Sequence, residues 1–201
     1  MKLHKWIQSI IRRGPIEGLN PCWFVSQYRI KLVREGGLPF VKYRIDNVEK
    51  AHSLVRKFIE SHGQSDRKQF VVLMLNEEHE VIGLNMVATG SPFTVSVGSR
   101  EILKPAILTN ASTIILCHSQ PNGDVQPSEE DLTYNEKIVW AACFFGVRVF
   151  DHLIISTADE GYFSFAEHGI IQKIYQSMNK PKSAASDNED ALLASKSATL
   201  H

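Results

Sequence analysis

A short polar stretch in the middle of the chain carries the side chains best suited to chemistry. His118 and Gln120 are two residues apart at the end of an apolar run, and Ser128 and Asp131 follow after a loop. Residues two apart in an extended strand project from the same face. A helix that begins at Ser128 would return Asp131 to that face, so that groups from two elements converge. Imidazole, carboxylate and water are ordinary zinc ligands, and the stretch therefore predicts a cation site.

The same residues also have simpler structural explanations, which the sequence leaves open. A lone histidine such as His118 is more often packed in a core than bound to a metal ion. Ser128 and Asp131 are three residues apart and fit a variant of the capping box, which satisfies backbone N–H groups at the start of a helix. Capping and metal binding are compatible roles for Asp131. We interpret Gln120 as a polar group that lines the site rather than as a strong ligand.

Apolar runs and amphipathic stretches predict the elements that would position this site. Short apolar or alternating runs indicate strands, and apolar residues at helical spacing indicate helices. Strands are expected at 70–75, 81–87, 112–117, 148–155 and 162–165, and helices at 47–61, 100–110 and 128–145. Because strands and helices alternate along the chain, we expect a single domain of the α/β (α+β) class, with a mixed β-sheet flanked by helices.

Composition excludes several classes of protein. The 201 residues are 43% hydrophobic and 22% charged, which suits one packed domain. The three cysteines are widely spaced, so we predict neither a disulfide framework nor a cysteine zinc site. Cys117 faces away from position 118 and is expected to be a core thiol. No apolar run approaches the roughly 20 residues of a membrane span, and no signal peptide is recognised, so we expect a cytoplasmic protein.

The two ends of the chain differ in composition from its middle. We expect a helix and a loop in residues 1–24, the main domain in residues 25–176 with an edge strand at 28–33, and a disordered tail in residues 177–201. Residues 1–45 carry nine Lys and Arg side chains against two Glu. This excess predicts weak, salt-sensitive association with nucleic acid at most, although a solvated charged face explains it as well.

The spacing of the polar stretch resembles the metal motif of a known family. Residues 118–124 read HSQPNGD and residues 127–131 read PSEED. In JAB/MPN (JAMM) domains the motif is His-x-His, seven residues, Ser, two residues, Asp, and the RadC-like branch typically reads HNHPSGD before Pro-Ser and Asp. The flanking strings KPAILTNASTIIL, FGVRVFDHLIIS and GYFSF resemble that branch too. The resemblance covers roughly residues 25–175 and implies a cytidine-deaminase-like fold.

This resemblance implies a zinc (Zn²⁺) metallopeptidase that hydrolyses an amide or isopeptide bond in a peptide or protein substrate. His118, Gln120 and Asp131 then stand at the metal-ligand positions. Ser128 is then the catalytic residue that donates a hydrogen bond to the developing oxyanion. Members of the family have also been described as DNA-repair proteins, which would link the domain to repair or recombination.

Three positions depart from the family pattern. Gln120 stands where the family has its second histidine, and Asn122 replaces a serine of the loop. A glutamine oxygen is neutral and a poorer zinc donor than imidazole. The glutamate that serves the family as general base aligns with Asn85, which cannot accept a proton from water. Glu80 or Glu101 could replace it only if the fold brings one of them close.

These departures leave two expected functions from different classes. The first is a RadC-like metallohydrolase with a weakened zinc site. The second is a non-catalytic JAB-fold module that binds or scaffolds a partner. The zinc content of the purified protein would distinguish the two.

Other conspicuous side chains are expected to have structural roles. Asp151 and His152 stand in a strand and are interpreted as structural or as support for the site, and His168 is expected to be incidental. Four apolar residues of the helix 128–145 are expected to face the core: Ile138, Trp140, Phe144 and Phe145.

Overall fold

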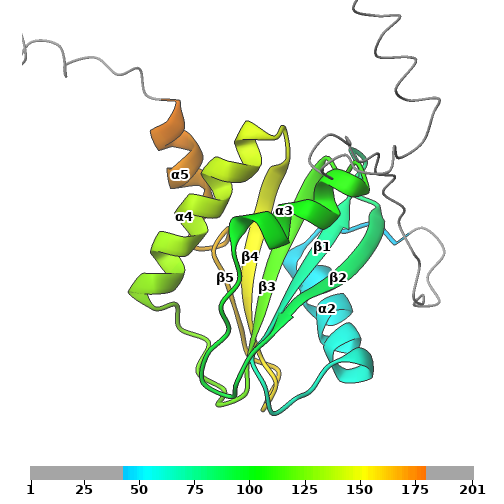
Figure 1. The fold of residues 1–201 in the computed structure, drawn as a ribbon, viewed down its shortest axis with the longest axis vertical. Coiled ribbons are helices and arrows are strands. Elements are labelled where there is room, and N and C mark those ends of the chain that lie inside the picture. Colours follow the sequence, from blue (N-terminus) through cyan, green and yellow to red (C-terminus); the bar gives the residue numbers. More distant parts are fainter. Residues whose placement is uncertain (1–42, 180–201) are drawn as a thin grey trace, which may run out of the picture. The chain divides into compact units, whose positions relative to one another are not determined.

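The computed structural model describes residues 43–179, in which five strands form one sheet with helices on both of its faces (Figure 1). The elements, in chain order, are α2 (Val48–His62), β1 (Gln69–Leu75), β2 (Val81–Thr89), α3 (Ser99–Leu108), β3 (Thr113–Gln120), α4 (Glu129–Phe144), β4 (Arg148–Ser156), β5 (Tyr162–Ser164) and α5 (Ile170–Met178). The predicted α/β class, single domain and mixed sheet are confirmed.

The strand order is β2-β1-β3-β4-β5, and only β3 and β4 run parallel to each other. A parallel pair needs a crossover connection, and α4 provides it. Strands β1, β3 and β4 occupy the centre of the sheet, which explains why their sequences are nearly continuous apolar runs. Every residue of β1 is buried.

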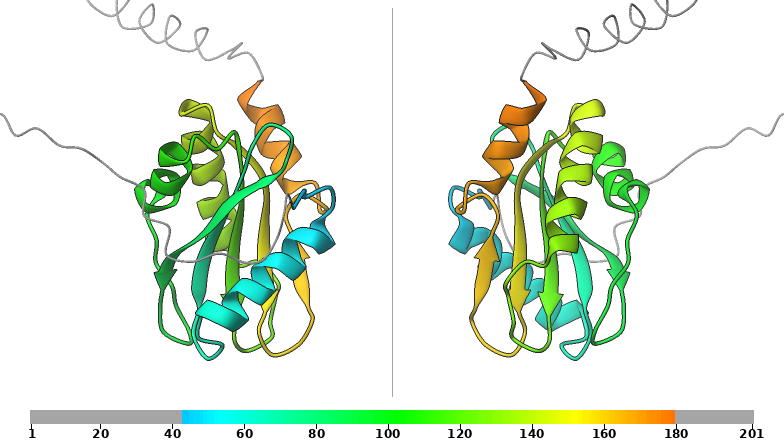
Figure 2. Two further views of the ribbon diagram at one scale, coloured as in Figure 1. Left: turned by 90° about the vertical axis from the view of Figure 1, so that its right-hand side faces the viewer. Right: turned by 90° about the vertical axis from the view of Figure 1, so that its left-hand side faces the viewer.

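Each face of the sheet has its own apolar core. Figure 2 shows the helices that cover the two faces. On one face, α2 packs Leu54, Val55 and Ile59 against the sheet. On the other face, α3, α4 and α5 bury the larger cluster, which includes Ile102 and Ile138. Because strand side chains alternate between faces, even-numbered residues of β3 point toward α4. His118 therefore lies on the face that α4 covers.

The helix that follows the polar loop begins where the local sequence predicts. Ser128 is the N-cap of α4, its hydroxyl accepts a hydrogen bond from the Asp131 N–H, and the Asp131 carboxylate accepts one from the Ser128 N–H. The predicted capping box is thus confirmed. A reciprocal cap of this kind fixes the first turn, because both side chains satisfy N–H groups that the helix leaves unpaired.

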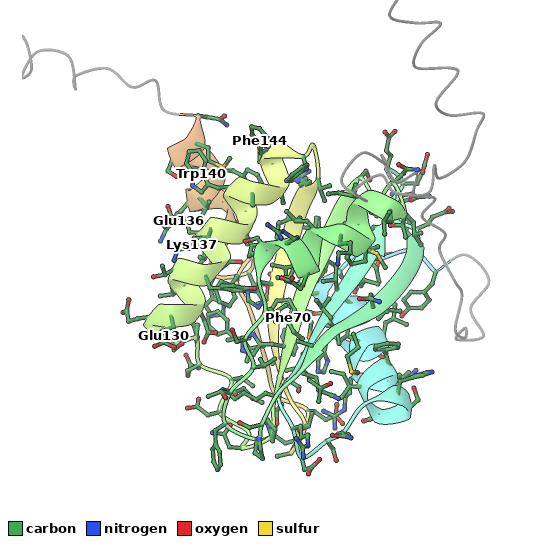
Figure 3. All side chains as sticks on the ribbon, viewed as in Figure 1. Phe70, Glu130, Glu136, Lys137, Trp140 and Phe144 are labelled. Carbon is green, nitrogen blue, oxygen red and sulfur yellow. The ribbon has the colours of Figure 1, made fainter. Side chains whose placement is uncertain are left out.

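The structure differs from the expectation at two helices. Helix α5 was not predicted, and it continues through residues 177 and 178, where the tail was expected to begin. The prediction that Trp140, Phe144 and Phe145 face the core is wrong, since they are 48%, 87% and 57% exposed. Figure 3 shows Trp140 and Phe144 along the outer side of α4. The face of α4 toward the sheet is instead filled by Ile138, Val139 and Ala142.

Several expectations fall outside the described residues. The helix and loop of residues 1–24, the strand at 28–33, most of the basic segment 1–45 and nearly all of the expected tail belong to residues 1–42 and 180–201. Within residues 43–179, no helix is both long enough and apolar enough to cross a membrane.

Candidate functional site

His118 lies near the end of β3, in the middle of the sheet. It pairs with Phe70 of β1 on one side and Ile154 of β4 on the other, and it is 5% exposed. The Phe70 ring stacks near the imidazole, with ring centroids 6.3 Å apart. The histidine is therefore held by neighbouring strands and by an aromatic ring, with only a small part of its surface in contact with solvent.

A chain of buried hydrogen bonds fixes the inner edge of this imidazole. His118 Nδ1 is 3.1 Å from His152 Nε2, and His152 Nδ1 is 3.3 Å from Asn135 Oδ1. With the Asn135 amide oriented so that Oδ1 faces the ring, His152 Nδ1 carries the proton and His152 Nε2 accepts one from His118 Nδ1; Asn135 Nδ2 then has no partner among the described residues. His118 then carries its proton on Nδ1, which leaves the lone pair of Nε2 for a ligand.

The reverse assignment of protons fits the geometry less well. If every hydrogen bond in the chain pointed the other way, His118 Nε2 would carry a proton and need an acceptor. The nearest candidate, Asp131 Oδ1, is 3.9 Å away, beyond hydrogen-bonding distance. Burial also lowers the pKa of His118 to about 4, with Asp131 opposing that shift, so the ring is neutral at pH 7. Burial likewise lowers the pKa of His152.

Asp151 anchors the strand that carries His152. Its carboxylate accepts hydrogen bonds from the backbone N–H groups of His152 and Ala166 and from the Ser164 hydroxyl, at 2.7, 2.8 and 2.5 Å. Burial nevertheless raises the pKa of Asp151 to about 6. His152 is further held by stacking on Phe165, with centroids 4.7 Å apart. Asp151 and His152 thus have the structural and supporting positions that their sequence context indicated.

Asp131 faces His118 from the first turn of α4. Its Oδ2 accepts from the Ser128 hydroxyl at 2.6 Å and from the Ser128 N–H at 2.9 Å, which fixes the orientation of the carboxylate. The other oxygen, Oδ1, points toward His118 Nε2. Two acceptor atoms therefore face each other across a gap of 3.9 Å, and no hydrogen bond among residues 43–179 fills it.

A pocket of about 520 Å³ opens above this gap. Its walls come from Lys68 and Phe70 at the start of β1, from the extended segment 93–97, from His118 and from the first turns of α4. Ser128 and Asp131 both line it, and so does Tyr134, whose hydroxyl donates to the Val97 carbonyl at 2.5 Å. The pocket thus brings together three of the four residues singled out in the sequence.

Gln120 is not among the residues that line the pocket. It ends β3, and its backbone carbonyl accepts from the N–H groups of Gly123 and Thr157, so the loop after the strand is tied to it. Its side-chain oxygen is buried without a hydrogen-bond partner among the described residues. The structure therefore places His118, Ser128 and Asp131 at one pocket and Gln120 beside it.

Asn85, which aligns with the family's general base, does not line the pocket, and neither do the two possible substitutes, Glu80 and Glu101. Asn85 is exposed on β2, in register with Val72 rather than with Phe70, the residue that pairs with His118. Glu80 lies at the β1–β2 turn, at the opposite end of these strands, where its carboxylate accepts from the Asn76 amide. Glu101 is in the first turn of α3.

The donor set can be compared with what zinc requires. Zinc sites use at least three protein ligands, at about 2.0–2.2 Å for nitrogen and oxygen. Within residues 43–179, no group of three or more His, Cys, Asp or Glu side chains could hold a metal ion. His118 and Asp131 supply two donors, and Gln120 supplies none to the pocket lining. The side chains at the pocket therefore do not fit a three-ligand zinc site.

Sequence reasoning missed several parts of the site. Asn135, which completes the buried chain, is fully buried one turn after Asp131, and a polar residue on the core side of a helix was the available signal. Phe70 and Tyr134 were visible only as apolar or helical positions. Cys117 is buried and burial raises its pKa, which confirms the prediction of a core thiol. His168 packs on Phe163, with ring centroids 4.0 Å apart.

Comparison with known proteins identifies the relatives of this chain. The sequence model of the RadC-like JAB domain matches residues 45–170. A UPF0758 protein of Rubrobacter xylanophilus is 35% identical over 143 residues, which are 71% of this chain and 59% of that protein. The UPF0758 protein YfjY of Escherichia coli K12 is 37% identical over 106 residues, 53% of this chain and 65% of the relative. The chain thus spans about three fifths of the length of these two relatives.

Proposed function

The chain belongs to the family of RadC-like JAB domains, and we propose that its pocket over His118 and Asp131 binds a peptide or protein partner without hydrolysing it efficiently. One observation carries the proposal: only two side chains of the family's metal motif offer donors to the pocket. A metal-dependent hydrolase needs a tightly held cation to activate water and polarise the carbonyl. Without a third ligand the cation is held weakly, and the activation of water that depends on it is weakened as well.

The positions of the acidic residues also favour a binding role. A general base must lie within hydrogen-bonding reach of the water it activates. Asn85 carries no acid, and neither Glu80 nor Glu101 lines the pocket. Loss of a general base typically costs a factor of about 10² to 10⁴ in rate. Weak metal binding and a missing base act together, so we expect little amide or isopeptide hydrolysis.

Ser128 keeps a role in this proposal without acting as a catalyst. Its hydroxyl and its N–H both bond to Asp131 Oδ2, which directs Oδ1 into the pocket. Ser128 is therefore proposed to orient an acceptor for the ligand. In a hydrolase the same hydroxyl would have to leave Asp131 in order to donate to an oxyanion.

Metal analysis of the purified full chain, together with an assay of peptide and isopeptide hydrolysis in added zinc, tests the proposal. We expect zinc well below one ion per chain and hydrolysis no faster than in an Asp131→Ala variant. Full zinc occupancy in the unmodified chain, lost in Asp131→Ala, together with hydrolysis that depends on Asp131, would overturn the proposal in favour of a zinc hydrolase.

A further inference from the structure

We propose that the pocket binds a primary ammonium group, held between His118 Nε2 and Asp131 Oδ1. This inference rests on the proposed binding function and adds the chemical class of the ligand. The two atoms belong to different elements, β3 and α4, and each group is oriented by hydrogen bonds at its other polar atom, His118 Nδ1 and Asp131 Oδ2. What they share is a lone pair directed at the same gap.

Two acceptors that face each other need a donor between them. His118 Nε2 is an acceptor because its Nδ1 proton is committed to His152. Asp131 Oδ1 is an acceptor because it belongs to a carboxylate whose other oxygen already takes both hydrogen bonds from Ser128. Facing lone pairs repel unless a cation, an N–H or an O–H group lies between them. The imidazole side chain is about nineteen-twentieths buried, so only a small part of its surface is in contact with bulk water.

The width of the gap distinguishes the candidate cations. A tetrahedral zinc ion bound to one nitrogen and one oxygen would bring them to about 3.4 Å from each other. The observed separation is 3.9 Å. An ammonium nitrogen about 2.9 Å from both atoms fits this separation, with both hydrogen bonds close to linear. The gap accommodates an N–H donor as it stands, whereas a tetrahedral zinc ion would need the two atoms about 0.5 Å closer together.

The walls of the pocket also favour a cation with an apolar stem. Phe70 and Tyr134 stand edge to face, with centroids 6.2 Å apart, and both line the pocket. Aromatic faces attract ammonium groups and pack against methylene chains. Glu129 and Glu130 stand with Asp131 at the rim, so three carboxylates oppose the two ammonium groups of Lys68 and Lys137.

An anionic ligand is disfavoured by the same features. The start of a helix normally attracts anions through its unpaired N–H groups. In α4 the first turn already carries Glu129, Glu130 and Asp131, and the capping box satisfies the N–H groups of Ser128 and Asp131. An anion would meet three carboxylates and two lone pairs, so we treat anion binding as an outcome that would contradict the inference.

Two parts of a peptide could supply the ammonium group: a lysine side chain and a free N-terminus. Both carry the same donor, but a lysine brings four methylene groups that can lie against the apolar lining of the pocket, which includes Val95, Val97 and Tyr134. The pocket volume of about 520 Å³ accommodates either group. The experiment therefore compares the two sources after it has tested the shared chemistry.

Amide-detected NMR titration of the full chain at pH 7 and constant ionic strength tests the inference. The probes are n-butylammonium chloride, tetramethylammonium chloride and sodium acetate. We expect butylammonium to shift the resonances of Phe70, Asp131 and Tyr134 saturably, with a dissociation constant on the order of millimolar. Tetramethylammonium has no N–H donor and is expected to bind at least about tenfold more weakly. Acetate should produce no saturable shift at these residues.

Two variants that each remove one negative charge from α4 test whether butylammonium binds at Asp131. Asp131→Asn replaces one acceptor with an amide that can donate to His118 Nε2 and fill the gap, so we expect butylammonium affinity to fall at least about tenfold. Glu136→Gln removes one negative charge from the same helix at an exposed position that does not line the pocket, and should change affinity by less than about twofold. Figure 3 shows Glu136 on the outer side of α4.

Two peptide-like probes distinguish a lysine side chain from a peptide N-terminus as the source of the ammonium group. Nα-acetyl-lysine amide presents only the side-chain ammonium, and glycinamide presents only the α-ammonium. We expect the lysine derivative to bind more tightly, because its stem packs on the apolar lining of the pocket, which includes Tyr134. Tighter binding of glycinamide would move the assignment to a peptide N-terminus and would contradict the role given to the aromatic wall.

Three results would overturn the inference: no saturable butylammonium shift, equal binding of tetramethylammonium, or saturable binding of acetate at the same residues. None of them depends on a variant, so the comparison of salts decides even if Asp131→Asn fails to fold. Zinc content measured on the same sample separates this outcome from the proposed function. If the protein binds neither zinc nor an ammonium ion, only the further inference is contradicted. Stoichiometric zinc together with Asp131-dependent hydrolysis would contradict the proposed function.

Discussion

The two edges of the His118 imidazole lie in contrasting surroundings. On the inner edge, Nδ1 bonds to His152, which bonds to Asn135, and Asp151 secures the strand behind them. On the outer edge, Nε2 faces a carboxylate oxygen that has no hydrogen bond to it. Of the two ring nitrogens of His118, only the inner one has a hydrogen-bond partner among the described residues.

This contrast indicates which edge stabilises the fold and which one serves a ligand. Buried polar groups normally have partners, because a buried group that lacks one costs about 1–3 kcal/mol. In the inner network His118 Nδ1 and both ring nitrogens of His152 have partners, while Asn135 Nδ2 has none among the described residues, and these contacts hold His118 in one tautomer. The outer pair departs from that rule at the wall of a pocket, where a ligand can provide the missing donor. Variants that alter each edge separately test this division.

Breaking the inner edge should have the largest cost. His152→Ala removes a buried ring that stacks on Phe165 and leaves the His118 Nδ1–H without an acceptor. We expect the free energy of unfolding to fall by about 3–4 kcal/mol, measured by urea denaturation. His62→Ala, at an exposed position in α2, should cost about 0.5 kcal/mol or less. Similar losses in the two variants would contradict the structural role of the inner network.

Restoring a histidine at position 120 should strengthen metal binding. Gln120→His supplies an imidazole where the family's motif has one, and a third ligand is expected to improve zinc affinity by about 100-fold. Competition with a chelator of known zinc affinity measures the change. The double variant Gln120→His/Asp131→Ala serves as control and should lose the gain. An unchanged zinc affinity would mean that a side chain at position 120 cannot bind the same ion as His118 Nε2.

Lowering the pH should weaken the fold through the inner network. The pKa of His118 is about 4 in the folded chain and near 6.5 when unfolded, so protonation favours the unfolded chain. Stability from this group is complete above pH 6.5 and falls by about 2 kcal/mol at pH 5. His152, whose pKa is also lowered, acts in the same direction. Urea denaturation at pH 7, 6 and 5 measures the decline.

Asp151 acts in the opposite direction and provides an internal check on this pH dependence. Its folded pKa of about 6 lies above the unfolded value of 3.8, so the folded chain holds the proton more tightly between these values. Proton uptake by Asp151 therefore stabilises the fold as the pH falls from 6 toward 4. It partly offsets the destabilising protonation of His118 and His152. Asp151→Asn should remove the offset and make the loss of stability between pH 6 and 5 steeper. A shallower loss in this variant would contradict the assigned shift.

Changing the outer edge should cost the fold least. Asp131→Ala removes half of the capping box and should lower the free energy of unfolding by about 1 kcal/mol. The matched change Glu136→Ala, on an exposed face of the same helix, should stay within about 0.5 kcal/mol. Thermal unfolding followed by circular dichroism measures both. A loss of 3 kcal/mol or more in Asp131→Ala would place this residue with the structural network.

Local sequence patterns predicted the elements well because their causes are local. The apolar runs at β1 and β3 required burial on both faces, and the spacing of Ser128 and Asp131 indicated the start of α4. Helix α5 was missed although Ile170, Ile171 and Ile174 stand at helical spacing, because it adjoins a polar tail. The helical spacing of apolar residues was present there, but it extended over only a few residues.

The site depended on contacts that the sequence does not reveal. His118 and His152 are 34 residues apart, and only the parallel pairing of β3 with β4 brings them together. Trp140 and Phe144 were assigned to the core because α4 is apolar on more than one side, and periodicity does not say which side meets the sheet. The tautomer of His118 likewise depends on Asn135, which only the folded structure places beside His152.

Whether His118 presents an unprotonated Nε2 to the pocket is measured directly by ¹⁵N NMR of the imidazole nitrogens at pH 7. We expect the chemical shift of a protonated nitrogen for Nδ1 and that of an acceptor nitrogen for Nε2, with the two values reversed or averaged in His152→Ala. A protonated Nε2 in the unmodified chain would rule out the ammonium site, because His118 and Asp131 would then form a donor–acceptor pair with no place for such a ligand.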